Sequence, residues 1–300
     1  MGALEFFLPA SEQHVSDHVE VELDPKLFNT LWVTMKKDEA SAVHNFSLPL
    51  LRNLRTLCDS LKENGSNWYS EGKMVPVNYA VMRSGHPDYF SLGGDIHHFR
   101  QCIEKRDKTS LYQYSKLCLD IVYDWATGLS SDMTTIALVQ GRALGGGFET
   151  ALGADIVIAE EQSQFGFPEI MFGLFPCTGG MSFLARRIGA YQAERMMTNA
   201  RIYSAQEMKD MGVIDEICPR GEGNLAVEKF IAGHAKRGLA RKVLQRGRRR
   251  LASIDYAEML TVLDEWVDVA LKLSDEELRV MEMLIMMQHG AGKRANIRAA

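Results

Sequence analysis

The chain has 300 residues, of which 46% are hydrophobic and 24% are charged, and its formal net charge is −5. This composition is typical of a globular protein, and the acidic balance argues against nucleic-acid binding by the surface as a whole. No apolar run approaches the roughly 20 residues that cross a bilayer, and the acidic N-terminal stretch is unlike a secretory signal.

The apolar pattern predicts short strands that alternate with helices over the first 220 residues. Strands are expected at 19–23, 31–35, 79–82, 135–139 and 155–159, and helices at 47–62, 95–106 and 109–128. Beyond residue 220 only helices are expected, at 223–236, 238–250, 255–271 and 275–288. This alternation indicates the α/β fold class. Residues 1–20 are interpreted as an N-terminal arm, 21–220 as the core, and 221–300 as a helical C-terminal region that is either a second subdomain or an oligomerisation element.

The most informative segment is 136–149, in which an apolar strand leads into Gly145, Gly146 and Gly147 and then into a run compatible with a helix. Glycine allows close backbone approaches, and the start of a helix presents unpaired N–H groups. Such a segment can bind negative charge, although a turn that serves only packing has the same glycines. The pattern is neither a dinucleotide-binding GxGxxG motif nor a P-loop.

A second segment, Phe90-Ser91-Leu92-Gly93-Gly94-Asp95, has the same character, because it follows a strand and leads into a helix. Asp95 is a favourable residue at the start of a helix. Two glycine-bearing helix entries could each donate one backbone N–H to the same oxygen. That is the minimum for an oxyanion hole.

Two glutamates lie in apolar stretches of the sequence. Glu149 follows Phe148, and Glu169 follows Pro168 within the apolar stretch 165–175. A carboxyl group in apolar surroundings has a raised pKa and can take and give a proton near neutrality. Each glutamate alone could equally be exposed or cap a helix, but the combination with the two glycine segments favours a catalytic role.

Three ordered motifs carry a family resemblance. The segments Gly141-x-Ala143-Leu144-Gly145-Gly146-Gly147-x-Glu149, Phe165-Gly166-x-Pro168-Glu169 and Gly173-x-x-Pro176-x-x-Gly179-Gly180 resemble the signature of the crotonase (enoyl-CoA hydratase) superfamily. Segment 90–96 is similar to the first oxyanion-hole loop of that family. The resemblance covers roughly residues 28–220. It implies an α/β spiral of ββα units, with C-terminal helices that pack between the subunits of a homotrimer or hexamer.

One branch of the superfamily fits better than the hydratases of fatty-acid degradation. Segment 137–141, Phe148, Leu174-Phe175-Pro176 and segment 265–268 look like the diffusible signal factor synthases, bacterial enzymes that make cis-2-unsaturated fatty acid quorum signals. The resemblance implies dehydration of a 3-hydroxyacyl-acyl-carrier-protein and hydrolysis of the thioester. The alternatives are an ordinary enoyl-CoA hydratase or isomerase and a non-catalytic protein of the same fold.

The resemblance also assigns roles by position. Glu149 and Glu169 are the catalytic pair, although which is the base and which the acid is left open, and the N–H groups of Leu92 and Gly146 form the oxyanion hole. Further residues are placed around the substrate: Gly93, Gly94, Gly145, Gly147, Phe148, Pro168 and Cys177. Cys177 stands where the family usually has glycine, so its side chain is expected to change the floor of the pocket.

No metal or cofactor is expected, because five scattered cysteines have neither a CxxC pair nor zinc spacing. Free thiols indicate a reducing cytoplasm. The acyl group would be carried by acyl carrier protein or coenzyme A. A basic cluster is either a dock for that acidic carrier or a solvated helix face: Lys236, Arg237, Arg241, Lys242, Arg246, Arg248, Arg249 and Arg250. Four methionines either line an acyl tunnel or pack in a core or subunit interface: Met281, Met283, Met286 and Met287.

Overall fold

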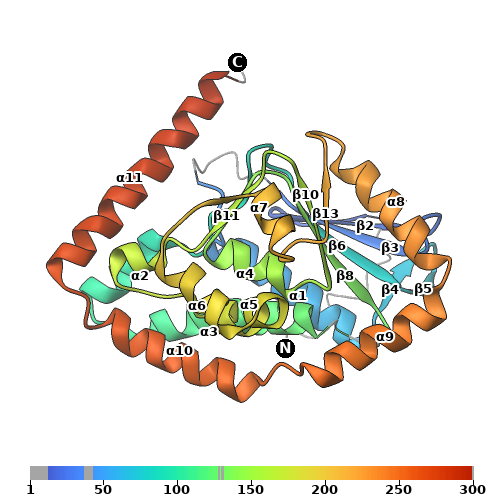
Figure 1. Ribbon diagram of the computed structural model, residues 1–300, viewed down its shortest axis with the longest axis horizontal. Helices are drawn as coiled ribbons and strands as arrows, with labels where there is room; N and C mark the ends of the chain where they lie inside the picture. The colour runs from blue at the N-terminus through green and yellow to red at the C-terminus, as the bar shows by residue number, and fades with distance from the viewer. Residues whose placement is uncertain (1–12, 37–42, 128, 130–131, 299–300) are drawn as a thin grey trace.

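The computed structural model describes residues 13–36, 43–127, 129 and 132–298. Its centre is a seven-stranded sheet in the order β1-β2-β3-β6-β8-β10-β13 (Figure 1). The strands of this sheet are β1 (Gln13–Val15), β2 (Val19–Asp24), β3 (Thr30–Met35), β6 (Tyr79–Ser84), β8 (Thr134–Val139), β10 (Ile156–Glu160) and β13 (Glu216–Cys218). Neighbours from β3 to β13 pair in parallel, whereas β1, β2 and β3 pair antiparallel. Parallel pairs need long crossover connections, which the helices supply.

Both faces of the large sheet are buried at its central strands β3, β6, β8 and β10, which explains their nearly continuous apolar sequences. Successive side chains of a strand point to opposite faces. In β8, Ile136 and Leu138 pack in one core cluster with Val227 of α8 (Gly223–Ala235). Ala137 and Val139 belong instead to the larger core cluster, which includes the buried faces of α1 (Leu48–Glu63) and α3 (Lys108–Ala126).

A smaller sheet in the order β12-β11-β9-β7 positions the candidate site. Its strands are β7 (Tyr89–Ser91), β9 (Arg142–Leu144), β11 (Gln164–Gly166) and β12 (Tyr203–Ser204). Strands β7, β9 and β11 are the next strands after β6, β8 and β10 of the large sheet, and they pair in parallel with one another. The segments that follow them, which begin at Leu92, Gly145 and Phe167, therefore leave the same edge of the sheet. This repetition of two strands and a helical connection confirms the predicted α/β spiral.

The remaining elements connect these strands and extend the core. They are the hairpin β4 (Asn67–Ser70) and β5 (Lys73–Pro76), helices α2 (Ile96–Glu104), α4 (Gly146–Gly153), α5 (Gly180–Ile188), α6 (Ala190–Thr198) and α7 (Ala205–Asp210), the 3₁₀ helix η1 (Glu169–Phe172), and α9 (Gly238–Leu251), α10 (Tyr256–Ala270) and α11 (Asp275–Arg298). No helix of the described residues is long and apolar enough to cross a membrane.

The predicted elements agree with this structure to within a few residues, except at the two ends of the chain. Helix α11 runs to Arg298 instead of ending at residue 288, and the short strands of the small sheet and of the hairpin β4–β5 are additional to the prediction. The predicted arm, residues 1–20, includes β1 and the start of β2, because Gln13–Val15 pairs with β2. The first twelve residues of that arm lie outside the described part of the chain. The sheet therefore begins about eight residues earlier than the expected boundary at residue 21.

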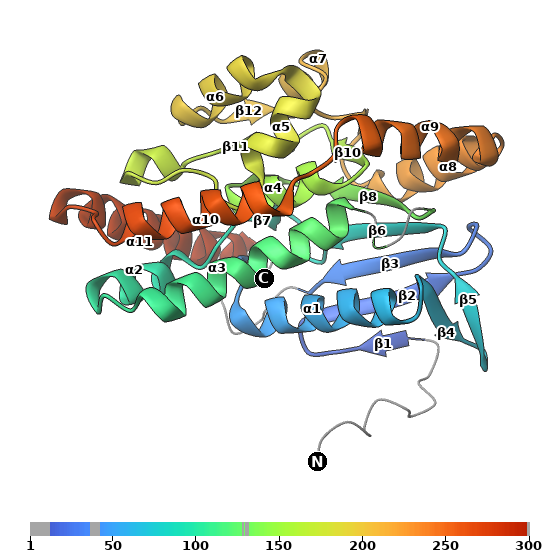
Figure 2. The ribbon, with the colours of Figure 1, turned by 90° about the horizontal axis from the view of Figure 1, so that it is seen from below.

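The C-terminal helices pack on the same chain rather than forming a separate unit. Helix α10 lies along α3 (Figures 1 and 2), and its Trp266 ring contacts Phe99 of α2 at a centroid distance of 5.1 Å. Helix α11 contacts α2 and η1, and its end projects away from the rest of the molecule (Figure 1). Trp266 is buried, so α10 completes the core around α3.

Helix α9 buries none of its residues and is held instead by a buried carboxylate at the start of β10. Asp155 forms ion pairs with Arg248 at 2.7 Å and with Arg249 at 2.5 Å, and it accepts a hydrogen bond from the Gln245 amide. The same carboxylate accepts the backbone N–H of Thr135 in β8. Part of the basic cluster therefore anchors α9 to the sheet.

Replacing Asp155 with alanine is expected to lower the free energy of unfolding by about 3 kcal/mol, because the largely buried guanidinium of Arg249 would lose the carboxylate that balances its charge. Urea unfolding followed by circular dichroism measures this change. Asp132→Ala, which removes the exposed partner of Arg246, should cost less than about 1 kcal/mol. Equal losses for the two variants would contradict the anchoring role.

Candidate active site

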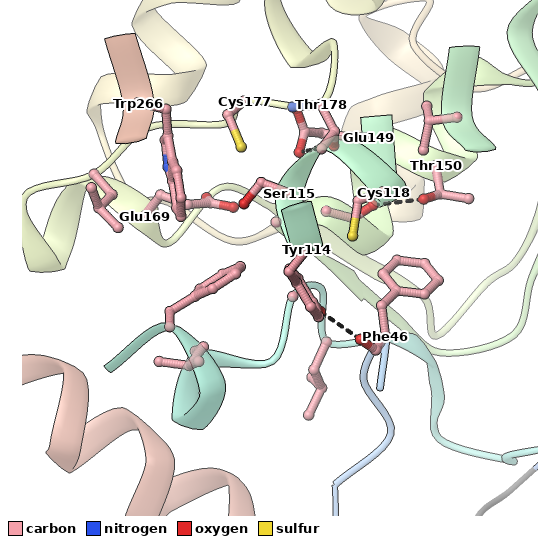
Figure 3. Close-up of a pocket in the computed structure, with 18 of the residues that line it drawn as sticks. Phe46, Tyr114, Ser115, Cys118, Glu149, Thr150, Glu169, Cys177, Thr178 and Trp266 are labelled. Atoms are coloured by element: carbon pink, nitrogen blue, oxygen red, sulfur yellow. Dashed lines mark hydrogen bonds between the residues drawn. The ribbon is translucent and has the colours of Figure 1, made fainter. Parts of the chain in front are cut away.

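The three predicted segments meet at one cavity between the small sheet and helices α1, α3 and α10 (Figure 3). Both glutamates and both glycine segments contribute to its wall, through Glu149, Glu169, Gly94 and Gly146. Most of the remaining wall is apolar and comes from distant parts of the chain: Phe46, Leu51, Leu54, Phe99, Ile121, Val122, Phe172, Leu174 and Trp266. Such a cavity can accept an aliphatic group and place it beside two carboxyl groups.

Glu149 is held on the first turn of α4 as a fully hydrogen-bonded carboxylate. Its Oε1 accepts the backbone N–H groups of Thr178 and Gly180, both at 2.8 Å, and its Oε2 accepts the Thr178 hydroxyl at 2.6 Å. Burial raises the pKa of Glu149, whereas these three donors lower it because they stabilise the anion. Burial has the larger effect, so the pKa of Glu149 stays above its ordinary value, and the three donors fix the orientation of the carboxyl group.

Glu169 has the opposite environment at the start of η1. Its Oε2 is buried and accepts no hydrogen bond within the described part of the chain. Burial, and then the charge of the nearby Glu149, raise the pKa of Glu169 to about 8. At neutral pH Glu169 therefore keeps its proton, whereas the donors around Glu149 favour the ionised form of that carboxyl group. The structure thus separates two residues that the sequence leaves equivalent.

The raised pKa of Glu169 predicts an alkaline limit to activity. As the pH rises through about 8, Glu169 loses its proton and the pair can no longer supply an acid, so kcat/KM is expected to fall. Folding stability should fall as the pH rises from about 4.5 to about 8, because over this range the folded chain keeps a proton that the unfolded chain has lost. Rates measured from about pH 6 to about pH 9.5 test the limit, and a profile that stays flat through pH 9 would contradict it.

Segment 90–95 presents a different N–H group to the cavity from the one expected. The Leu92 N–H donates to the His44 carbonyl at 2.8 Å, so it is not free to bind a substrate oxygen, and its assignment to the oxyanion hole is wrong. Gly93 has φ 92°, which turns the chain after Leu92. The N–H of Gly94, the residue after this turn, has no acceptor among the described residues.

Gly94 and Gly146 face each other across the two segments. A Cβ placed on Gly146 would lie 3.5 Å from the Gly94 nitrogen. The Gly146 N–H is the first of α4, where no helical carbonyl is available to it. These two N–H groups both reach the cavity and can donate to one oxygen between them, so the structure supports Gly94 rather than Leu92 as the partner of Gly146.

Buried hydrogen bonds hold segment 90–95 in place. The Phe46 N–H donates to the Gly93 carbonyl at 2.9 Å, and the Phe46 carbonyl accepts the Tyr114 hydroxyl, which in turn accepts the Asp95 N–H. The His44 ring is bonded to the Ser84 hydroxyl at 2.9 Å. Donors fixed in this way need no rearrangement when charge develops on a bound oxygen.

Two glycines of segment 136–149 are required because other parts of the chain approach their backbone closely. A Cβ on Gly147 would lie 2.3 Å from the Ser91 carbonyl oxygen, so this glycine lets the two segments touch. Gly145 has φ 52°, and a Cβ there would lie 2.3 Å from Oε1 of Glu169. The triple glycine therefore sets both the spacing of the two segments and the position of Glu169.

Of the side chains predicted to contact the substrate, two line the cavity and one does not. Pro168 and Cys177 line the cavity, and burial raises the pKa of the Cys177 thiol well above its usual range, so it is a neutral side chain in the wall. Phe148 does not line the cavity. It is fully buried behind the site against Phe165 and Phe167, with ring centroids at 5.3 and 4.9 Å. Phe148 therefore supports the backbone of the site rather than touching a substrate.

Several lining residues could not be identified from the sequence. Three are on α3 and one is on α10: Tyr114, Ser115, Cys118 and Trp266. Ser115 and Cys118 are three residues apart, which places them on one face of α3, but nothing local shows that this face meets the glutamates. The four methionines named above are absent from the cavity lining: Met281 is buried in the core, and Met283, Met286 and Met287 are exposed.

The sequence is similar to a family of known proteins. A model of the enoyl-CoA hydratase/isomerase family matches residues 74–237. The mitochondrial enoyl-CoA hydratase of Pongo abelii is 30% identical over 62% of this chain and 61% of its own length. The 2,3-dehydroadipyl-CoA hydratase of Escherichia coli is 30% identical over 45% of this chain and 50% of its own length. The chain thus spans about half the length of the curated relatives it matches.

Solved structures share the fold. An enoyl-CoA hydratase from Bacillus halodurans superposes with a TM-score of 0.72 and 21% identity, over 89% of this chain and all of the other. DspI of Pseudomonas aeruginosa superposes with a TM-score of 0.64 and 23% identity, over 85% of this chain and 96% of the other. The described elements, including the C-terminal helices, therefore follow an architecture seen in other proteins.

Proposed function

The chain belongs to the enoyl-CoA hydratase/isomerase family, and we propose that it synthesises a cis-2-unsaturated fatty acid signal. In this proposal it dehydrates a 3-hydroxyacyl-acyl-carrier-protein to the cis-2-enoyl thioester and then hydrolyses the thioester. The observation that carries the proposal is the pair of carboxyl groups beside an apolar cavity, with three hydrogen-bond donors on Glu149 and none on the buried Oε2 of Glu169 among the described residues. Dehydration requires such a pair, because one proton leaves C2 while another is given to the departing hydroxyl.

The two unpaired N–H groups supply the other requirement of this reaction. Removal of the C2 proton places enolate charge on the thioester oxygen, and the N–H groups of Gly94 and Gly146 would stabilise that charge as it develops. In other enzymes one such donor contributes about 10²–10³ in rate. The buried hydrogen bonds of Phe46 and Tyr114 keep the Gly94 N–H in place before substrate arrives.

Hydrolysis of the thioester would use the same groups. Once the two carboxyl groups have exchanged protons with solvent after dehydration, Glu149 can take a proton from a water molecule whose oxygen attacks the thioester carbonyl, and the two N–H groups can hold the oxyanion of the tetrahedral intermediate. Collapse of this intermediate breaks the C–S bond and releases the pantetheine thiol, which takes its proton from the pair of carboxyl groups. No redox or metal chemistry enters either step, so the proposal needs no cofactor beyond the pantetheine arm that carries the acyl group. The similarity of segments 137–141 and 265–268 to diffusible signal factor synthases supports the choice of substrate and product.

The second candidate function is hydration or isomerisation of an enoyl-coenzyme A. It is favoured by the relatives of known sequence, which are hydratases of coenzyme A thioesters. The same pair, with one proton, can add water across a C2–C3 double bond as readily as it can remove water. The two candidates differ in the geometry of the double bond and in the release of free acid.

Contacts with a carrier and with other copies of the chain belong to the proposal as well. Arg248 and Arg249 are engaged with Asp155, so a dock for an acidic carrier would use the other basic residues of α8 and α9. Apolar side chains are exposed on the C-terminal helices, as at Leu239, Leu244 and Leu251. Exposed apolar surface of this kind supports the expected trimer or hexamer, which light scattering of the purified protein would detect.

Product analysis tests the proposed function. Purified protein is mixed with 3-hydroxyacyl-acyl-carrier-proteins of several chain lengths, and the products are identified by mass spectrometry and by comparison with cis and trans standards. Free cis-2-enoic acid that is absent with Glu149→Ala and Glu169→Ala would establish signal synthesis. A trans-2-enoyl thioester without free acid would instead establish the hydratase function.

A further inference from the structure

A buried serine in the cavity wall has no role in the reaction described so far. Ser115 of α3 is 1% exposed and lines the cavity, yet its hydroxyl has no hydrogen-bond partner in the described part of the chain. Serine and threonine in helices commonly donate to the carbonyl four residues earlier, as Thr127, Thr150 and Thr198 do here. The Ser115 hydroxyl does not, and Figure 3 shows it pointing into the cavity on the side of Glu169.

The other polar side chains of the wall are occupied by the protein itself. Tyr114 bonds the Phe46 carbonyl, Thr150 bonds the Gly146 carbonyl, and Thr178 bonds Glu149. Among the residues of this wall that the structure describes, only the Ser115 hydroxyl and Oε2 of Glu169 are buried and have no hydrogen-bond partner. An unpartnered buried hydroxyl destabilises a fold, because it loses its hydrogen bonds to water without replacement. A ligand that bonds both groups would remove that cost.

We propose that Ser115 and Glu169 together bind the 3-hydroxyl group of the substrate, with Ser115 as the residue that selects 3-hydroxyacyl thioesters over saturated ones. A hydroxyl oxygen can accept one hydrogen bond and donate another, which matches a serine hydroxyl beside a protonated carboxyl group. This inference rests on the proposed function, since it concerns the oxygen that leaves as water. The rest of the α3 wall, Cys118, Ile121 and Val122, offers no comparable partner.

The selectivity follows from the chemistry of one hydrogen bond. A substrate with a 3-hydroxyl satisfies Ser115, whereas a saturated acyl chain leaves the serine as it is in the free protein. Removing the serine hydroxyl should therefore weaken interactions with the 3-hydroxyacyl substrate and leave those with the saturated chain unchanged. Such a difference separates a binding role for Ser115 from a role in packing.

The test compares Ser115→Ala with the unchanged protein on two thioesters of equal chain length. One is the 3-hydroxyacyl-acyl-carrier-protein that is turned over best, and the other is its saturated counterpart, used as a competitive inhibitor. We expect kcat/KM for the first to fall about tenfold, and the inhibition constant of the second to change less than about twofold. The thermal unfolding midpoint should rise, because alanine favours helix and leaves no unpartnered hydroxyl.

Two further variants make the result specific. Ser115→Thr keeps a hydroxyl and should retain the preference for the 3-hydroxyacyl substrate. Cys118→Ala removes a small side chain from the same face of α3 and should change both constants in parallel. Parallel changes with Ser115→Ala would overturn the inference, since they indicate packing. If the unchanged protein turns over no 3-hydroxyacyl thioester, the proposed function itself fails, and the two failures are distinct.

Discussion

Replacing either Glu149 or Glu169 with glutamine is expected to lower the rate of water elimination by at least about a thousandfold. Glutamine has nearly the same shape as glutamate but can neither take nor give the required proton. In Glu149→Gln the three donors of Thr178 and Gly180 would also meet an amide that has only one acceptor oxygen. The measurement is single-turnover formation of the enoyl product from the 3-hydroxyacyl thioester.

A matched control comes from a buried glutamate outside the cavity. Glu160 at the end of β10 is 3% exposed and accepts hydrogen bonds from Gln162 and Gly223. Glu160→Gln should leave the rate within about twofold, because this carboxylate lies outside the cavity wall. A comparable loss in all three variants would show that the losses come from altered folding and not from the chemistry.

The Glu149→Gln and Glu169→Gln variants should differ from each other in stability to unfolding. Glu169→Gln is expected to raise the unfolding midpoint above about pH 8, because the native chain no longer has to bury an ionised carboxylate there. Below the unfolded pKa of a glutamate, near 4.5, the native carboxyl is already protonated, so the substitution should have little effect. Glu149→Gln should lower stability instead, since it breaks hydrogen bonds that the carboxylate makes.

The second large effect is expected from Gly145→Ala. The new Cβ would lie 2.3 Å from Oε1 of Glu169, so the carboxyl group has to move out of its position. A displacement of about 1 Å in a catalytic group can cost about a hundredfold in rate, and we expect a loss of at least that size in kcat/KM. Steady-state kinetics on the 3-hydroxyacyl thioester measures it.

Gly212→Ala separates this displacement from backbone strain. Gly212 has φ 76°, close to the φ of Gly145, but a Cβ there would meet no atom within 4 Å. Each alanine should cost about 1–2 kcal/mol of stability because of its left-handed conformation. Only Gly145→Ala should also lose activity. If Gly212→Ala lost activity to the same extent, the contact with Glu169 would not be the cause.

Local sequence was sufficient for the long helices and for the central strands of the large sheet, and it singled out the candidate pair of glutamates, but it did not show the short strands β7, β9, β11 and β12. Helix and strand positions follow from apolar periodicity and capping residues, which act within a few residues of one another. The pair Glu149 and Glu169 follows from the same kind of local signal, a carboxyl group embedded in an apolar run beside a glycine-bearing helix entry. Their convergence on one cavity also rests on family resemblance, since the two residues lie 20 positions apart on different segments.

Tertiary structure decided which of these groups are free and which are engaged. The Leu92 N–H donates to the His44 carbonyl, so that Gly94 is left to face Gly146, and three donors bond Glu149 whereas burial raises the pKa of Glu169. Such outcomes depend on hydrogen bonds and burial between segments that are far apart in the chain.

The same reasoning applies to the walls of the site and to the charged surface. Ser115 and Trp266 reach the cavity because α3 and α10 pack together, and Arg249 is engaged because Asp155 starts a strand some ninety residues earlier. Periodicity shows that a helix has a buried face, but it does not show what that face meets. The sequence by itself therefore indicated the long helices, the central strands of the large sheet, the glycine segments and the two glutamates, whereas only long-range packing decided the small sheet, the hydrogen-bond partners of these groups and the shape of the cavity.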